Sequence, residues 1–346
     1  MRRPRLSATP AVAAAISAFS ALAMFAAPAS GAILDGYTPG LGLSLFDNHL
    51  VIGGYLALNL NALDQQRDSL KLEDLSLFVT WQPTDHLKFF SEFEVEDSFM
   101  IEDDGLHAGH DVERLERLYA EWEPNDTFRL RVGKMLTPIG IWNVIHAAPL
   151  VWTVSRPLAT ENFFDTAVTG ATLDVTLLRG NVGLVATMFG QATEHLDEPE
   201  GPKCSKHAGG GRLELSTERG PRFGVSYVRF DNENTGYWES TFSGDFFWET
   251  SRFELSGEAS INDPSSGPTT TGLYTQFVYL PRWKLRLYPV IRVEYVDLGT
   301  IQRTPVVFGL AWKPTLNTIV KAEGIVGGDD TDLGGEGMRA SLAVLF

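Results

Sequence analysis

The last nine residues of the chain, Met338-Arg-Ala-Ser-Leu-Ala-Val-Leu-Phe346, decide the fold class. Apolar side chains occupy every second position of this stretch, and it finishes on an aromatic residue. Because a β-strand presents successive side chains to opposite faces, the stretch predicts a strand that is apolar on one face and ends at a membrane interface. Only helices and closed barrels cross a bilayer, since an open sheet edge leaves backbone groups unpaired in lipid. The stretch therefore predicts one strand of a transmembrane β-barrel.

The first segment of the chain has the composition of a secretory signal. Three arginines among the first five residues precede an alanine-rich apolar run over 11–27, and small residues between Ala29 and Ala32 suit cleavage. A retained helical anchor is the alternative, although the run is short for a membrane span. We therefore expect a signal peptide over 1–32, followed by one barrel domain over 33–346.

Alternating apolar and polar side chains recur along the rest of the chain in segments of about ten residues, bounded by turn residues. They predict an all-β, antiparallel transmembrane barrel of about sixteen strands, with 14 or 18 strands as alternatives. The predicted strands cover residues 49–60, 70–82, 86–97, 113–123, 127–136, 165–178, 181–191, 208–218, 221–231, 236–248, 251–261, 271–280, 283–296, 304–313, 317–327 and 336–346. Short connectors alternate with longer polar ones, as expected for short periplasmic turns and longer outer loops.

The segment 86–97 illustrates the pattern. Phe89 and Phe93 share one face, whereas Glu92 and Glu94 share the other. In a barrel, lipid contacts the apolar face and a wet lumen contacts the charged face. The alternation slips at two places, where we expect a β-bulge or a shifted register. These places are Glu73-Asp74 and Tyr227-Val228.

Composition narrows the functional classes. The net charge of −16 disfavours nucleic acid as a partner. A single cysteine, Cys204, excludes a disulfide framework within the chain. The sequence has no Gly-rich phosphate loop, paired-cysteine cluster or haem-attachment motif. We therefore expect neither a cofactor nor a bound metal.

The longest connector, 137–164, is unusually apolar for a surface loop and contains two tryptophans, Trp142 and Trp152. Exposed apolar surface of this size is unfavourable in water. We therefore expect this third outer loop to fold into the lumen and narrow it. The alternatives are an extra pair of strands or a loop buried at a subunit interface.

The run Leu130-Arg-Val-Gly-Lys-Met-Leu-Thr-Pro-Ile-Gly140, followed by Trp142-Asn143, resembles the strand-to-loop signature of the phosphate-selective porin O/P-like family of outer-membrane porins. The preceding strand, from Glu113 to Trp122, is also similar to that family, and the resemblance covers about residues 113–175. It implies a homotrimeric, sixteen-stranded porin in the outer membrane of a Gram-negative bacterium. Such a protein is a passive channel for small hydrophilic solutes or ions, in contact with outer-membrane lipid and lipopolysaccharide.

Charged side chains on the predicted lumen faces and in the long loop are candidates for the pore lining and its constriction. Basic residues on one side and carboxylates on the other would create a transverse field, and such charges decide which ions a pore favours. A weak preference for cations is expected from the acidic outer loops. The alternative for each residue is a merely solvated or paired charge. The candidates are Glu92, Glu94, Glu96, Arg117, Glu121, Arg129, Arg131, His146, Arg156, Glu161, Asp165, Lys284, Arg286 and Arg292.

Two other functions remain open from the sequence. A barrel of this kind can serve as a structural sheath or conduit around a partner protein, although a wide conduit usually needs more strands. An outer-membrane hydrolase is less favoured, because His146, Ser155 and Asp165 lie near one another in sequence without a surrounding motif. We therefore expect no catalytic residues.

Overall fold

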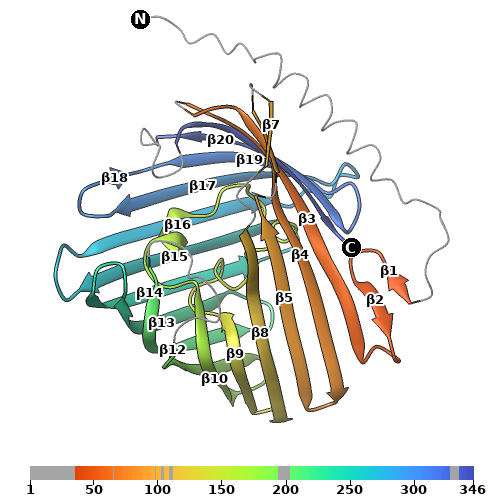
Figure 1. Ribbon diagram of the computed structural model, residues 1–346, viewed down its shortest axis with the longest axis vertical. Coiled ribbons are helices and arrows are strands. Elements are labelled where there is room, and N and C mark those ends of the chain that lie inside the picture. The colour runs from red at the N-terminus through yellow and green to blue at the C-terminus, as the bar shows by residue number, and fades with distance from the viewer. Residues whose placement is uncertain are drawn as a thin grey trace, which may run out of the picture.

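The computed structural model describes residues 36–64, 66–97, 99–102, 105–108, 112–193, 203–327 and 335–346. Sixteen antiparallel strands form a closed barrel (Figure 1). The barrel closes where β21 pairs with β3, over the register from Gly337↔Leu63 to Leu345↔Tyr55. The barrel strands are β3 (Leu50–Leu63), β4 (Ser69–Thr84), β5 (Leu87–Glu96), β8 (Val112–Asn125), β9 (Phe128–Leu136), β10 (Ala167–Leu178), β11 (Val182–Gln191), β12 (Ser205–Thr217), β13 (Arg222–Asn232), β14 (Tyr237–Glu249), β15 (Phe253–Pro264), β16 (Thr270–Tyr279), β17 (Leu287–Asp297), β19 (Val306–Trp312), β20 (Thr318–Val326) and β21 (Gly337–Leu345).

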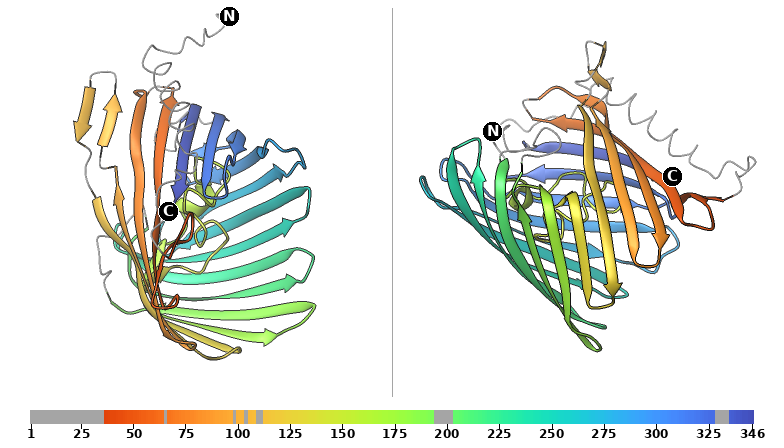
Figure 2. Two further views of the ribbon diagram at one scale, coloured as in Figure 1. Left: turned by 90° about the vertical axis from the view of Figure 1, so that its right-hand side faces the viewer. Right: turned by 60° about the horizontal axis from the view of Figure 1, so that its bottom comes forward.

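Short elements decorate the barrel. β1 (Tyr37–Thr38) and β2 (Gly42–Leu45) pair with each other, and β2 also pairs with the start of β3. β6 (Phe99–Glu102) and β7 (Gly105–Ala108) form a hairpin that projects from one end of the barrel, and β6 pairs with the start of β4 (Figure 2). β18 (Gln302–Arg303) pairs antiparallel with the end of β17. In the part of the chain that the structure describes, no helix has the length and apolar character needed to span a membrane.

The predicted alternation of faces is seen in the barrel. Large apolar side chains such as Phe93 and Phe242 are more than half exposed on the outer face, where water would make them unfavourable. Glu92 and Glu94, which flank Phe93 on β5, point the other way and are buried inside. The wall is therefore apolar toward lipid and polar toward the lumen, as a transmembrane barrel requires.

Each of the sixteen predicted strands has a counterpart, and most begin within three residues of the predicted start, but one begins four residues late. The strand predicted over 283–296 begins at Leu287. Arg286 has φ of 51°, and this left-handed backbone conformation interrupts an extended strand. Lys284 and Arg286 therefore lie in the exposed turn between β16 and β17 rather than on a lumen-facing strand.

The two slips in alternation have different outcomes. A β-bulge is confirmed at the first, because Ala57 pairs with Asp74 while the next residue, Leu58, pairs with Leu72. Glu73 is the extra residue. At the second, pairing runs without interruption, and Val228 faces inward against other apolar side chains. The second break in the alternation of apolar and polar residues is therefore not a bulge. It arises because Val228 is an apolar residue that faces inward.

Some predictions fall outside the described residues. These are the signal peptide over 1–32 and most of the acidic outer-loop residues near 103–104, 194–200 and 329–332.

Candidate functional site

The segment between β9 and β10 lies inside the barrel, and it includes the short helix α2 (Leu158–Glu161) (Figure 1). We call residues 137–166 the inner loop. Its side chains Ile139, Phe163 and Phe164 are buried and pack against inward-facing Val228 and Phe230 of β13. Burial of these apolar groups stabilises the inward position of the loop. The apolar composition of the connector therefore did predict its location.

Carboxylates of the barrel wall hold the backbone of the inner loop. Each accepts a hydrogen bond from a main-chain N–H group that would otherwise be buried without a partner. The bonds run from Trp142 N to Glu258 Oε1 (2.9 Å), from Val154 N to Glu323 Oε2 (2.8 Å), from Ser155 N to Glu323 Oε1 (2.8 Å) and from Leu158 N to Glu294 Oε2 (2.7 Å). These wall strands, β15, β17 and β20, attach the loop along one side of the lumen.

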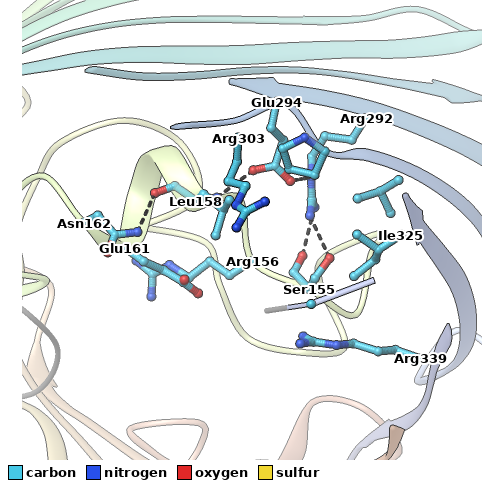
Figure 3. Close-up of a pocket in the computed structure, with 13 residues that line it drawn as sticks. Ser155, Arg156, Leu158, Glu161, Asn162, Arg292, Glu294, Arg303, Ile325 and Arg339 are labelled. Carbon is cyan, nitrogen blue, oxygen red and sulfur yellow. Dashed lines mark hydrogen bonds and ion pairs between the residues drawn. The ribbon is translucent and has the colours of Figure 1, made fainter. Parts of the chain in front are cut away.

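Arg292 adds a basic anchor on the same side (Figure 3). Its guanidinium donates to Ser155 O (2.8 Å), Ser155 Oγ (2.7 Å) and Thr153 Oγ1 (2.6 Å), and its Nε donates to Glu294 (2.7 Å). Only 1% of Arg292 is exposed. The side chain is therefore buried against the inner loop, where it also forms part of the lining of the cavity between that loop and the wall (Figure 3).

Asp165 and Lys321 fasten two more points of the loop. Asp165 Oδ2 accepts hydrogen bonds from Ser205 N and Ser205 Oγ, both at 2.8 Å, at the start of β12. Lys321 Nζ donates to the carbonyl oxygens of Ala148 (3.0 Å) and Thr153 (2.9 Å). Asp165, expected at the constriction, is therefore buried where the loop returns to the wall.

The sequence pattern did not identify Glu258, Glu294, Glu323 or Lys321 as loop anchors. Their signal was present, since each occupies an inward position of its strand between apolar or small outward residues. The pattern identifies a charge that faces inward. It does not say whether the charge meets water or a folded loop.

The opposite wall carries a second group of charges, on β5, β8 and β9. Glu92 is paired with Arg117, and Glu121 accepts a hydrogen bond from Arg131 Nε at 2.7 Å. Glu121 also pairs with Lys88. These contacts bring together most of the charged residues predicted for the three strands.

Further along β5, carboxylates form a separate cluster with Asp74 of β4. Glu94 Oε1 accepts hydrogen bonds from Tyr55 Oη (2.8 Å) and Ser76 Oγ (2.7 Å). Glu96 pairs with Arg114 at 2.8 Å. The carboxylates of Asp74, Glu94 and Glu96 lie within 4.8 Å of one another.

The inner loop divides the charged groups between two cavities. A cavity of about 220 Å³ lies between the loop and the wall formed by β17 to β21, and Arg156, Glu161, Arg303 and Arg339 line it (Figure 3). Arg156 and Glu161 come from the loop, whereas the other two come from the wall. Burial raises the pKa of the Glu161 carboxyl, although nearby Arg156 opposes this effect.

A second cavity, of about 270 Å³, lies against the other side of the loop. Arg129 and Arg131 of β9 line it together with Asp174 of β10, and the loop contributes Val144 and Ile145. Val144 and Ile145 are both more than two-fifths exposed. Charged wall and apolar loop therefore face each other across this space.

His146 connects the inner loop to the strand β8. Its Nε2 lies 3.5 Å from Glu116 Oε1, and its Nδ1 is 3.1 Å from the carbonyl oxygen of Asn143. Burial, with a further contribution from Arg156, lowers the pKa of His146 to about 4. The imidazole is therefore neutral near pH 7. Contacts with β8 on one side and β20 on the other show that the loop crosses the lumen.

No family model matches the chain. An uncharacterized protein of Aquifex aeolicus is 35% identical over 117 residues, which are 33% of this chain and 26% of that protein. The chain thus matches about a quarter of the length of this curated relative.

Solved structures with similar folds are outer-membrane channels. The Salmonella typhi OmpF complex with daunomycin has a TM-score of 0.60 at 11% identity, covering 87% of this chain and 99% of that one. The anion-selective porin from Comamonas acidovorans has a TM-score of 0.58 at 12% identity, with 86% and 98% covered. The channel DcaP of Acinetobacter baumannii has a TM-score of 0.55 at 11% identity, with 88% and 99% covered.

The chain has the porin fold. Together with the apolar outer face, this fold places it in the outer membrane of a Gram-negative bacterium, as predicted.

Proposed function

We propose that this protein is a porin, a passive diffusion channel for small hydrophilic solutes or ions with charge selectivity at a loop constriction. The observation that carries the proposal is the inner loop, which is tied by its backbone to wall carboxylates while charged side chains line the cavities on both of its sides. A loop held in this way narrows the lumen and leaves a charged cavity on each of its sides. Transport is then downhill and requires no cofactor.

Selectivity in this proposal comes from the charges that border the two cavities. On one side of the loop these are Arg156, Glu161 and the arginines of the wall, and on the other Arg129 and Arg131. Glu92, Glu94, Glu96, Arg117 and Glu121 contribute carboxylates and a further guanidinium to the wall. Rings and patches of charge along a pore determine which ions it favours. The acidic outer loops tilt the preference weakly toward cations.

The remaining predictions complete the proposal. Residues 1–32 are a signal peptide and 33–346 form one porin domain, which the motif from Leu130 to Gly140 assigns to the phosphate-selective porin O/P-like family. The protein is a homotrimer in contact with outer-membrane lipid and lipopolysaccharide. Support for assembly comes from the projecting β6–β7 hairpin, where Leu106 is 72% exposed. Cross-linking of detergent-folded protein would give a ladder ending at three copies, and a single band would contradict the trimer.

The two alternatives fit the geometry less well. A sheath around a partner protein needs a wide interior, whereas the inner loop crosses this lumen. A hydrolase needs a nucleophile in contact with its base. Ser155 Oγ is instead bonded to Arg292, and His146 lies against Glu116.

Planar bilayers test the proposal directly. Purified protein should add discrete steps of conductance in potassium chloride, and a salt gradient should give a small reversal potential of cation-selective sign. Heat-denatured protein from the same preparation is the control. Folded protein that inserts into the bilayer without conductance steps would contradict the channel.

A further inference from the structure

Four aromatic side chains form a continuous row on the inner wall, across the neighbouring strands β3, β4, β5 and β8. Tyr55 lies 5.8 Å from Phe78 between ring centroids, Phe78 lies 6.1 Å from Phe90, and Phe90 lies 5.4 Å from Tyr119. Separations of this size are typical of aromatic groups in contact. The proposed charge filter makes no use of this row.

The register shows that the row faces inward. Residues at the alternate positions of the same strands face the lipid. These are Leu77, Phe93 and Leu118, each more than two-fifths exposed. Because side chains alternate along a strand, Phe78 and Phe90 point to the lumen. Both are partly exposed, as is Tyr119, whereas Tyr55 is buried at the end of the row. The inner wall thus carries an aromatic strip, and its Tyr119 end also packs against the apolar cluster of the inner loop.

Paired charges lie over two rings of the strip. The guanidinium carbon of Arg117 lies 4.8 Å from the centre of the Phe90 ring, and that of Arg131 lies 5.9 Å from the centre of the Tyr119 ring. Both arginines are bonded to carboxylates, Arg117 to Glu92 and Arg131 to Glu121. The strip is therefore an apolar surface beside donors and acceptors whose charges largely cancel.

We propose that this strip binds carbohydrate, so that the channel carries sugars along its inner wall; this inference rests on the proposed porin function. A pyranose ring has C–H groups on its face and hydroxyl groups around its rim. The face packs on Phe78, Phe90 and Tyr119, because apolar surface is removed from water there. The rim hydroxyls exchange hydrogen bonds with the Arg117–Glu92 and Arg131–Glu121 pairs, since hydroxyl groups both donate and accept.

Other solute classes match the strip less well. A purely aromatic solute packs on the rings but covers the neighbouring charged groups without satisfying them, and that is costly. A small anion gains little from arginines that already hold carboxylates. A polyol without a ring offers hydroxyls but no flat apolar face. The combination of ring surface and neutralised charge therefore selects a cyclic sugar.

The test measures sugar block of ion current in planar bilayers, with maltotriose as the probe. Maltotriose should reduce the current in a saturable way, with half-saturation on the order of millimolar. Two controls are used at equal concentration: sorbitol, an acyclic polyol, and benzoate, an aromatic anion. Sorbitol should lower the ion current only by raising the viscosity of the solution, and benzoate only by replacing chloride as a charge carrier. Saturable block by benzoate but not by maltotriose would overturn the ligand class.

Variants then locate the block. Phe90→Ala should raise the half-saturating concentration of maltotriose about three- to tenfold, since one stacking surface is lost. Phe93→Ala removes the same side chain three residues along the strand, on the lipid face, and should leave the block unchanged. Phe90→Leu, which keeps apolar volume and favours folding, should resemble Phe90→Ala because it also lacks the ring. Equal block in all four proteins would overturn the assignment to the strip.

The two proposals fail in different ways. Normal conductance steps without maltotriose block refute the carbohydrate strip and leave the porin intact. If no conductance is found, titration calorimetry of detergent-folded protein with maltotriose still decides the inference. Heat released in the wild type and diminished in Phe90→Ala supports a sugar site, and no heat in either refutes it.

Discussion

Gly140 lies directly against the carboxylate of Glu258. A Cβ atom built on Gly140 would stand 1.7 Å from Glu258 Oε2, and the glycine has φ of 69°. The carboxylate is held from two other sides, since it accepts hydrogen bonds from Trp142 N (2.9 Å) and Tyr274 Oη (2.7 Å). It therefore has little freedom to move away. This contact fixes where the inner loop leaves β9 and enters the lumen.

Gly140→Ala should release the first half of the inner loop. The substitution combines a left-handed backbone position, which disfavours side chains, with a clash against a held carboxylate, and we expect a stability loss of about 1–3 kcal/mol. Single-channel conductance should rise and become noisier as the loop moves. Gly324→Ala on β20 is the control, because the atom nearest to a Cβ built there, Gly337 O, is 4.0 Å away. Equal conductance in both variants would show that Gly140 does not set the loop position.

Arg292→Met should loosen the second half of the loop. It removes the donor to Ser155 and Thr153 and leaves Glu294 buried without its cation, so a destabilisation of about 3–5 kcal/mol is expected. The temperature at which the folded band disappears on a denaturing gel should fall clearly. Arg179→Met is the matched control, because its pair with Asp126 is largely exposed and contributes at most about 1 kcal/mol. Similar temperatures for the two variants would contradict a role of Arg292 as an anchor.

Alternation along the chain predicted the barrel because the environment of each strand is uniform on its outer face. Lipid tolerates few exceptions there, so Phe93 or Phe242 identifies the outward parity. The inner face is not uniform. Val228 and Phe230 are apolar because the inner loop covers them, and this broke the expected pattern on β13. The sequence of β13 alone cannot show that residues of the inner loop, distant in the chain, pack against its inner face.

The same limit applies to the candidate site. The sequence predicted Arg292 on the lumen face of a strand and Asp165 in the long loop, at the constriction. Arg292 is instead bound to the inner loop at the edge of the first cavity, and Asp165 lies where the loop returns to the wall. The path of the inner loop across the lumen determines which inward-facing charged side chains are exposed to solvent. That path is set by distant partners such as Glu323, 168 residues from Ser155.

Arg129→Glu should shift ion preference toward cations. Arg129 is 45% exposed in its side chain and lines the cavity beside the inner loop, where its charge acts at short range. The reversal potential in a gradient of potassium chloride should move in the cation-selective direction, and more so at low salt because screening is weaker. Arg179→Glu, in the turn after β10, has the same change of charge outside the lumen. Unchanged permeability ratios in Arg129→Glu would show that this arginine does not face the ion path.

His146 should make the loop sensitive to mild acid. Burial and the neighbouring Arg156 lower its folded-state pKa to about 4, against 6.5 as the ordinary value. Between these values the unfolded chain takes up a proton that the folded chain does not, so the free energy of unfolding falls as pH decreases from about 6.5 to 4. The loss should be about 1–3 kcal/mol, since one pKa unit corresponds to about 1.4 kcal/mol and the imidazole keeps some contact with water.

The measurement is urea unfolding in detergent at about pH 7 and pH 4.5, for the wild type and His146→Gln. Other groups that titrate in this window affect both proteins alike, so the difference between them isolates His146. The wild type should lose more stability on acidification than His146→Gln. Parallel losses would mean that His146 takes up its proton as readily in the folded barrel as in the unfolded chain, and that its contact with Glu116 offsets the burial.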